Sequence, residues 1–189
     1  DLHSPEAVGQ ELGKELSKGR VDEFLTRQLI RSAKLMSLDV KSGVCESLIN
    51  SLDVLYPVFP TVMIFLKSVL PELDEGTAKV IHSRIRSLMS AKSYIIKVPN
   101  NLAYSIRVLG SDHSDEADRL LARQFRESDN SAIRRDIILS MASRGNHAWI
   151  SDCRNAYPSL TSWEKRALLI ASYVLEDEGH HWRESLKGV

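Results

Sequence analysis

The residues best suited to a chemical task lie between positions 76 and 111, where the chain has lysines, arginines and tyrosines but no aspartate or glutamate. Cationic side chains neutralise a phosphate backbone, and aromatic rings stack on nucleotide bases. Asn100 and Asn101 add amide donors near the start of an expected helix, where anions bind. The pattern predicts a nucleic-acid contact formed by Lys79, Arg84, Arg86, Lys92, Tyr94, Lys97 and Arg107.

The same stretch has two simpler interpretations: a solvated face that is basic by chance, or a face that meets an acidic partner. The nucleic-acid hypothesis requires the cations to share one accessible surface. Arg84 and Lys92 are eight positions apart, so a helix running through both would place them two turns apart on one side. Arg86 is expected on a neighbouring flank of that helix, and Arg107 on the next helix.

Other groups of metal-binding or catalytic residue types are weaker candidates. His180 and His181 lie near Asp177, Glu178 and Glu184. Adjacent histidines point in different directions on a helix, whereas helical metal ligands recur at i and i+4, so we interpret this group as an exposed tail. The chain has no G-x-S-x-G sequence, no glycine-rich phosphate loop and no carboxylate pair in an apolar setting. We predict no catalytic residue, no metal and no cofactor.

The two cysteines, Cys45 and Cys153, each lie in an apolar helical stripe and are interpreted as core thiols. They are far apart and form no CxxC or Cys/His cluster. A disulfide framework and a zinc site are therefore not expected, and a reducing cytoplasm is the default location. The most apolar stretch, residues 54–70, is interrupted by Pro57, Pro60 and Lys67, so no membrane span is predicted.

The elements that position these residues are expected to be helices. Aromatic residues are only 6% of the 189 residues and glycines are few, which favours an all-α protein over a β-sandwich. Lysine plus arginine equals aspartate plus glutamate at 25 each, so the net charge indicates no partner. Periodicity, caps and prolines predict about ten helices: 5–17, 21–36, 42–55, one after Pro60, 77–91, 99–110, 114–126, 129–145, 147–157 and 161–175, with a short last helix at 178–186.

The helix with the clearest pattern covers residues 129–145. Its apolar positions recur with a helical period, Asn130 or Ser131 can cap its first turn, and Gly145 ends it. Ser140 and Ala142 are small enough to let a neighbouring helix approach closely. The apolar face holds Ile133, Ile137, Ile138 and Met141, and the opposite face carries Arg134, Arg135, Asp136 and Arg144.

A second helix repeats this pattern about 30 residues later. Thr161 and Glu164 form a capping box, and the apolar positions of the two helices match at one constant offset. Helix, turn and helix recurring at such a period are typical of a HEAT-like α-solenoid of antiparallel helix pairs, although an ordinary bundle remains an alternative. The residues expected to be buried are Ile133, Ile137, Ile138, Met141, Trp163, Leu168 and Ala171.

The second half of the chain resembles the helical region behind the polymerase core of bacterial antiphage reverse transcriptases, which are related to retron and abortive-infection enzymes. The likeness covers about residues 56–182. It rests on Ser131-Ala132-Ile133-Arg134-Arg135, Gly145, Trp149, Leu160-Thr161-Ser162-Trp163-Glu164-Lys165-Arg166-Ala167, Asp177-Glu178 and Trp182.

The resemblance implies a parent protein that copies RNA into DNA. Residues 1–71 would then be a helical segment that docks onto a missing polymerase thumb, and residues 72–189 would form HEAT-like repeats. The catalytic aspartates of such enzymes lie in a Tyr-x-Asp-Asp-type motif, which this chain lacks, so no catalytic residue is carried over.

Three functional hypotheses follow. The chain is an accessory region of a defence reverse transcriptase that binds RNA or DNA or organises the assembly, a free-standing HEAT-like adaptor for other protein subunits, or an enzyme with a dispersed site. The basic stretch favours the first hypothesis over the second. A pocket holding a carboxylate with a perturbed pKa would favour the third.

Overall fold

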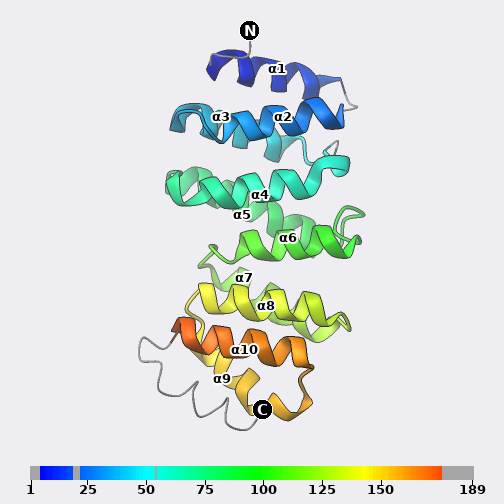
Figure 1. The fold of residues 1–189 in the computed structure, drawn as a ribbon, viewed down its shortest axis with the longest axis vertical. Helices are drawn as coiled ribbons and strands as arrows, with labels where there is room; N and C mark the ends of the chain where they lie inside the picture. The colour runs from blue at the N-terminus through cyan, green and yellow to red at the C-terminus, as the bar shows by residue number, and fades with distance from the viewer. Residues whose placement is uncertain (1–4, 19–21, 54, 176–189) are drawn as a thin grey trace. The chain divides into compact units, whose positions relative to one another are not determined.

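Ten α-helices and three short 3-10 segments make up the structure, a computed structural model (Figure 1). It describes residues 5–18, 22–53 and 55–175, and these residues contain no β-strand. The all-α prediction is confirmed. The expected short helix at 178–186 lies outside the described residues. The 3-10 segments Tyr56–Val58, Leu70–Glu72 and Tyr157–Ser159 each have proline as their second residue.

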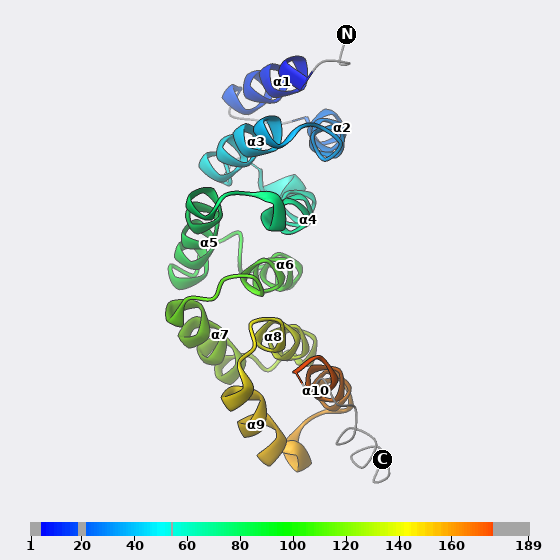
Figure 2. The ribbon, with the colours of Figure 1, turned by 90° about the vertical axis from the view of Figure 1, so that its left-hand side faces the viewer.

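The chain divides into two compact units, residues 1–108 and 109–189, a division that does not coincide with the expected boundary at 71/72. In the first unit, the odd-numbered helices form one layer and the even-numbered helices a second (Figure 2). Helices α2, α4 and α6 run in the same direction, so their carboxyl ends lie on the same side. The bounds are α1 (Pro5–Ser17), α2 (Glu23–Ala33), α3 (Leu38–Asn50), α4 (Phe59–Val69), α5 (Glu75–Ser90) and α6 (Pro99–Leu109).

Residues 109–175, the described part of the second unit, contain four helices, and α8 packs along α10. The small buried residues Ser140 and Ala142 on α8 fit the expected close approach of a neighbouring helix. Within each unit, helices paired in sequence pack in two layers, as stacked helix pairs require. The bounds are α7 (Asp115–Glu127), α8 (Ser131–Ser143), α9 (His147–Asn155) and α10 (Ser162–Leu175).

Helix starts are fixed by polar side chains that accept hydrogen bonds from otherwise unpaired backbone N–H groups. Asn130 Oδ1 accepts from Ala132 N at 2.9 Å, as expected. The capping box is also confirmed. Thr161 N donates to Glu164 Oε2 at 2.9 Å, and Glu164 N donates to Thr161 Oγ1 at 3.4 Å. Local sequence therefore sets where these helices begin.

Six of the seven residues expected to be buried are buried: Ile133, Ile137, Ile138, Met141, Leu168 and Ala171. Trp163 was wrongly predicted, because its side chain is 53% exposed. Glu164 takes the inward position beside it, where it completes the capping box and pairs with Arg134 at 3.0 Å. Trp163 is turned to the flank, with the Arg135 guanidinium 5.5 Å from its ring centroid.

Helical periodicity also predicts that four further residues lie on apolar helix faces, but all four are exposed: Phe24, Val80, Ala156 and Val174. In α5, the inward position next to Ile81 is occupied by His82 instead of Val80. The predicted apolar faces of these helices are about one residue too wide, because apolar residue type alone does not separate the centre of a helix face from its edge.

The polar face of α8 is largely covered by the rest of the second unit. Asp136 is buried and accepts hydrogen bonds from Arg135 at 2.7 and 2.9 Å. The Arg134 guanidinium lies 4.3 Å from the ring centroid of Phe125 on α7, and that ring packs edge-on against Trp149. Charged groups with partners, and not only apolar contacts, therefore define the environment of α8.

Arg144, the C-cap residue of α8, has a side chain that is only 2% exposed. Its Nε donates to Asp118 Oδ1 at 2.9 Å, Nη2 donates to the Ser114 carbonyl at 2.8 Å, and Nη1 donates to the Leu109 carbonyl at 3.2 Å. One guanidinium thus joins the end of α8 to the start of α7 and to the first residue of the second unit.

Replacing Arg144 with Met should lower the free energy of unfolding by about 2–4 kcal/mol, because the Asp118 carboxylate loses a charged partner and the Leu109 and Ser114 carbonyls each lose one of their donors. Urea denaturation measures the change. Asp118→Asn, which keeps a hydrogen-bond acceptor, is the milder control, with an expected loss of about 1 kcal/mol. Equal stability of Arg144→Met and wild type would show that this network contributes little.

Helices α5 and α8 end in the same backbone motif. After α8, Gly145 N donates to Ala142 O and Asn146 N donates to Met141 O, with Gly145 at φ 72°. After α5, Lys92 N donates to Met89 O and Ser93 N donates to Leu88 O, with Lys92 at φ 48°. The left-handed position of this motif favours glycine, so Lys92 occupies a position that is strained for any residue with a Cβ atom.

Lys92→Gly should therefore raise the free energy of unfolding by about 0.5–1 kcal/mol, although it removes a side chain. Gly145→Ala should lower it by a similar amount, because no neighbouring atom lies within 4 Å of an added Cβ and only the backbone conformation opposes the change. Urea midpoints of the two variants and wild type measure both effects. A destabilised Lys92→Gly protein would mean that the Lys92 side chain stabilises the fold by more than its backbone strain costs.

Candidate nucleic-acid interface

The seven residues predicted to bind nucleic acid lie on three consecutive segments of the first unit. Lys79, Arg84 and Arg86 are on α5, and Arg107 is in the last turn of α6. Lys92, Tyr94 and Lys97 lie in the connection between these helices and are exposed. Arg84, Arg86 and Arg107 are half-buried.

Helix geometry separates two of the α5 arginines. A rotation of about 100° per residue directs Arg84 and Arg86 about 200° apart around the helix axis. The buried side chains of Ile81, Ile85 and Leu88 lie between them. Lys92 follows the end of α5 at Ser90, so the expected two-turn spacing from Arg84 does not apply.

The fold brings together two tyrosines from different segments. Tyr94 lies in the α5–α6 connection, and Tyr56 begins the 3-10 segment before α4. Their ring centroids are 5.7 Å apart and their planes are tilted by 40°. Tyr56 is 41% exposed and Tyr94 is 55% exposed, so this tyrosine pair presents aromatic surface to solvent.

Asp53, in the turn after α3, contacts both Tyr94 and Arg84. Tyr94 Oη donates to the Asp53 backbone carbonyl at 2.9 Å, and an Arg84 guanidinium nitrogen lies 3.7 Å from the Asp53 carboxylate. The carboxylate is well exposed, so this ion pair contributes little to stability. Its negative charge beside the tyrosine pair opposes the approach of a phosphate.

Arg27 on α2 fixes the 3-10 segment that carries Tyr56. Its Nη1 donates to Thr61 Oγ1 at 2.6 Å, and its Nη2 donates to the Pro57 carbonyl at 3.0 Å. Because Pro57 directly follows Tyr56, this arginine ties the backbone beneath the tyrosine to α2 and α4. The ring of Tyr56 therefore projects from an anchored segment.

Two of the predicted cations have partners close to them in sequence. Lys79 Nζ lies 2.7 Å from Glu75 Oε1, and its hydrogen bond lowers the pKa of Glu75. The Arg107 guanidinium lies 5.0 Å from the ring centroid of Tyr104, one turn earlier on α6. The positive charge of the stretch is thus partly compensated at Lys79, and Arg107 makes a cation–π contact.

Arg107 also belongs to a row of cations that the sequence patterns did not reveal. Arg31, Lys67 and Arg107 each occupy the last turn of one of the parallel helices α2, α4 and α6. A cation in the last turn also stabilises the helix macrodipole, so this row has a structural explanation as well. Its sequence signal is one basic residue before the end of each of the helices α2, α4 and α6. The sequence signal for Tyr56 is the Tyr-Pro pair that starts its 3-10 segment.

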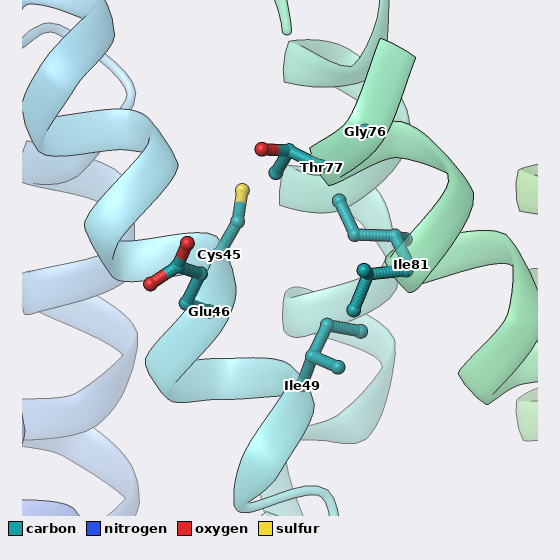
Figure 3. A pocket seen from close by; sticks show the side chains of 7 residues that line it. Cys45, Glu46, Ile49, Gly76, Thr77 and Ile81 are labelled. Atoms are coloured by element: carbon teal, nitrogen blue, oxygen red, sulfur yellow. The ribbon is translucent and has the colours of Figure 1, made fainter. Parts of the chain in front are cut away.

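A cavity of about 230 Å³ lies between α3 and α5. Figure 3 shows Cys45 on α3 and Thr77 on α5 facing each other across it. Burial raises the pKa of the Cys45 thiol to about 12, so the thiol stays protonated and is a poor nucleophile. Ile49, Val80 and Ile81 make the remaining lining mostly apolar. These features do not form a catalytic centre.

No group of histidine, cysteine, aspartate and glutamate side chains suited to a metal ion occurs in residues 5–18, 22–53 and 55–175. His180 and His181 lie outside this part of the chain. Of the helices that the structure describes, none is both long enough and apolar enough to cross a bilayer. The chain matches no protein-family model, and no similar curated protein or solved structure was found.

Both cysteines should be unreactive in the folded protein. Burial raises the pKa of Cys45 and of Cys153 to about 12, leaving only about one thiolate in ten thousand at pH 8. A thiol-specific chromogenic disulfide should react with neither cysteine in buffer and with both in 6 M guanidinium chloride. Because the unfolded thiols ionise near pH 9, folding stability should also fall as the pH rises above that value. Rapid stoichiometric labelling of the folded protein would contradict the buried position of these residues.

Proposed function

We propose that this chain is a non-catalytic helical scaffold whose first unit binds RNA or DNA. The observation that carries the proposal is the exposed tyrosine pair, Tyr56 and Tyr94, beside a stretch of 36 residues, 76–111, that contains cations and no acidic residue. Aromatic faces and cations are the two surface types that a flexible nucleic acid uses without reading its sequence.

The expected binding is weak and depends strongly on salt. Released counterions provide most of the free energy of such contacts, and each cation that meets a phosphate increases the salt dependence. Asp53 and Glu75 oppose this attraction, because their carboxylates lie beside Arg84 and Lys79. The net charge of zero gives no additional long-range attraction.

The biological setting that we propose is an accessory region of a cytoplasmic bacterial antiphage reverse transcriptase, where the scaffold would bind the template or product or organise the assembly. This part of the proposal rests on the sequence resemblance described above. Finding a Tyr-x-Asp-Asp motif in the polypeptide encoded together with this chain would support it. An unrelated catalytic domain there would contradict it and leave the binding proposal intact.

A protein adaptor is the second candidate function, and α10 provides the observation that favours it. Trp163, Ile170, Tyr173 and Val174 are each more than half exposed on this helix. Their spacing along α10 places them around one side of the helix. Exposed apolar surface of this kind is typical of protein interaction sites.

Changing both Arg84 and Lys92 to Glu should weaken binding by a similar factor for every RNA and DNA sequence, because these side chains are proposed to meet phosphates. The slope of log K against log salt should become shallower by up to about two. Fluorescence anisotropy with labelled oligonucleotides between 50 and 200 mM salt measures both effects. Asp53→Asn should have the opposite effect, because it removes a repelling carboxylate and keeps the backbone carbonyl that holds Tyr94.

Arg119→Glu on α7 is the matched control, since Arg119 is an exposed arginine of the other unit that pairs weakly with Glu116 at 3.8 Å. It changes the charge by the same amount per residue and should leave binding unchanged. Wild-type binding by the Arg84/Lys92 double variant would contradict the nucleic-acid proposal and make the protein adaptor the leading candidate.

A further inference from the structure

We infer that the tyrosine pair selects single-stranded nucleic acid by stacking unpaired bases on Tyr56 and Tyr94. The inference rests on the proposed function and adds the class of ligand to it. Both rings are exposed, and both come from segments held by hydrogen bonds to neighbouring elements. A stacking surface must be exposed and also fixed in orientation, and the tyrosine pair meets both requirements.

The geometry of the pair determines where bases bind. A base inserted between two parallel rings needs about 6.8 Å, twice the 3.4 Å spacing of stacked bases. The Tyr56 and Tyr94 centroids are 5.7 Å apart and their planes are tilted by 40°, so no base fits between them. Bases therefore stack on the outward faces of the rings, at most one on each.

Base stacking on these rings excludes an intact duplex. In double helices the faces of internal bases are covered by their neighbours, whereas unpaired bases can turn outward and stack on aromatic side chains. A duplex can meet only the surrounding cations through its phosphates. Because Asp53 weakens the positive field at Arg84, that electrostatic contact alone is expected to be the weaker mode of binding.

Holding the rings in place reduces the entropy lost on binding. Tyr94 is fixed at its hydroxyl by the Asp53 carbonyl, and Tyr56 is fixed through its backbone by the bond from Arg27 to Pro57. The first bond joins the α5–α6 connection to the turn after α3, and the second joins α2 to the 3-10 segment before α4. Tyr94→Phe should therefore keep the stacking surface but loosen its position, whereas Tyr94→Leu removes the surface itself.

The experiment compares three probes at 100 mM salt: a 15-nucleotide dT strand, a 15-nucleotide rU strand and a 20-base-pair DNA duplex, each labelled with fluorescein. Wild type should bind both single strands at least about tenfold more tightly than the duplex. Tyr94→Leu and Tyr56→Leu should each weaken single-strand binding between about fivefold and a hundredfold. Duplex binding and the salt slope should not change, because no phosphate contact is removed.

Tyr94→Trp supplies a readout that a purely structural role of Tyr94 would not produce. The variant should keep single-strand affinity, and its additional tryptophan emission should be quenched by dT and rU strands but not by the duplex. Thermal unfolding followed by circular dichroism verifies that each variant is folded. Tyr56→Leu and Tyr94→Trp keep the inference testable if Tyr94→Leu does not fold.

The outcomes distinguish the two proposals. Equal binding of single strands and duplex, with a salt slope that the Arg84/Lys92 variant reduces, overturns the stacking inference and leaves the proposed function standing. Full single-strand affinity in both leucine variants also overturns it. No binding of any probe by wild type overturns the inference and the proposed function together.

Discussion

The second unit depends on one buried cation. A guanidinium offers five donors in a fixed plane, and a buried guanidinium must find acceptors for them. Arg144 donates through its three guanidinium nitrogens to the Asp118 carboxylate and to the Leu109 and Ser114 carbonyls, which also accept from backbone N–H groups. A charge that is 2% exposed is tolerated only when its donors are matched in this way. The requirement fixes the end of α8 against the start of α7, and the apolar contacts of Ile137 and Ile138 form around that arrangement.

The sequence predicted the helices well because their signals are local. Periodicity located the face of α8, Asn130 and Gly145 marked its ends, and the Thr161–Glu164 capping box marked the start of α10. The burial of particular polar residues could not be predicted in this way. Hydrophobicity places Trp163 inside and Glu164 outside, whereas the capping box and the ion pair with Arg134 reverse that order. The partner that stabilises Glu164 lies on another helix, and local patterns carry no information about it.

The candidate interface could likewise be predicted only in part from local sequence patterns. The cations and Tyr94 could be predicted because residues 76–111 contain no aspartate or glutamate, which the sequence shows directly. The Tyr-Pro pair at Tyr56 is visible in the sequence, but the proximity of Tyr56 and Asp53 to Tyr94 is not, because it arises only from the packing of the turn after α3 against the α5–α6 connection. Helical spacing also grouped Arg84 with Lys92, although α5 ends before Lys92 is reached. A surface assembled from several turns requires the tertiary structure, even when each helix is correctly predicted.

At position 92, the stability of the fold favours glycine, whereas the proposed binding of nucleic acid favours lysine. The motifs that end α5 and α8 have the same hydrogen bonds and both contain a left-handed residue, so the fold accepts glycine at this position, as Gly145 demonstrates. A lysine there carries a conformational cost of about 1 kcal/mol that glycine would not. The backbone conformation therefore does not explain why this position is a lysine. A cation in the α5–α6 connection, close to Tyr94 in sequence, suits the proposed nucleic-acid ligand. Strained backbone at a candidate binding site is an observation from which function can be inferred, and here it agrees with the charge pattern and with the exposed rings.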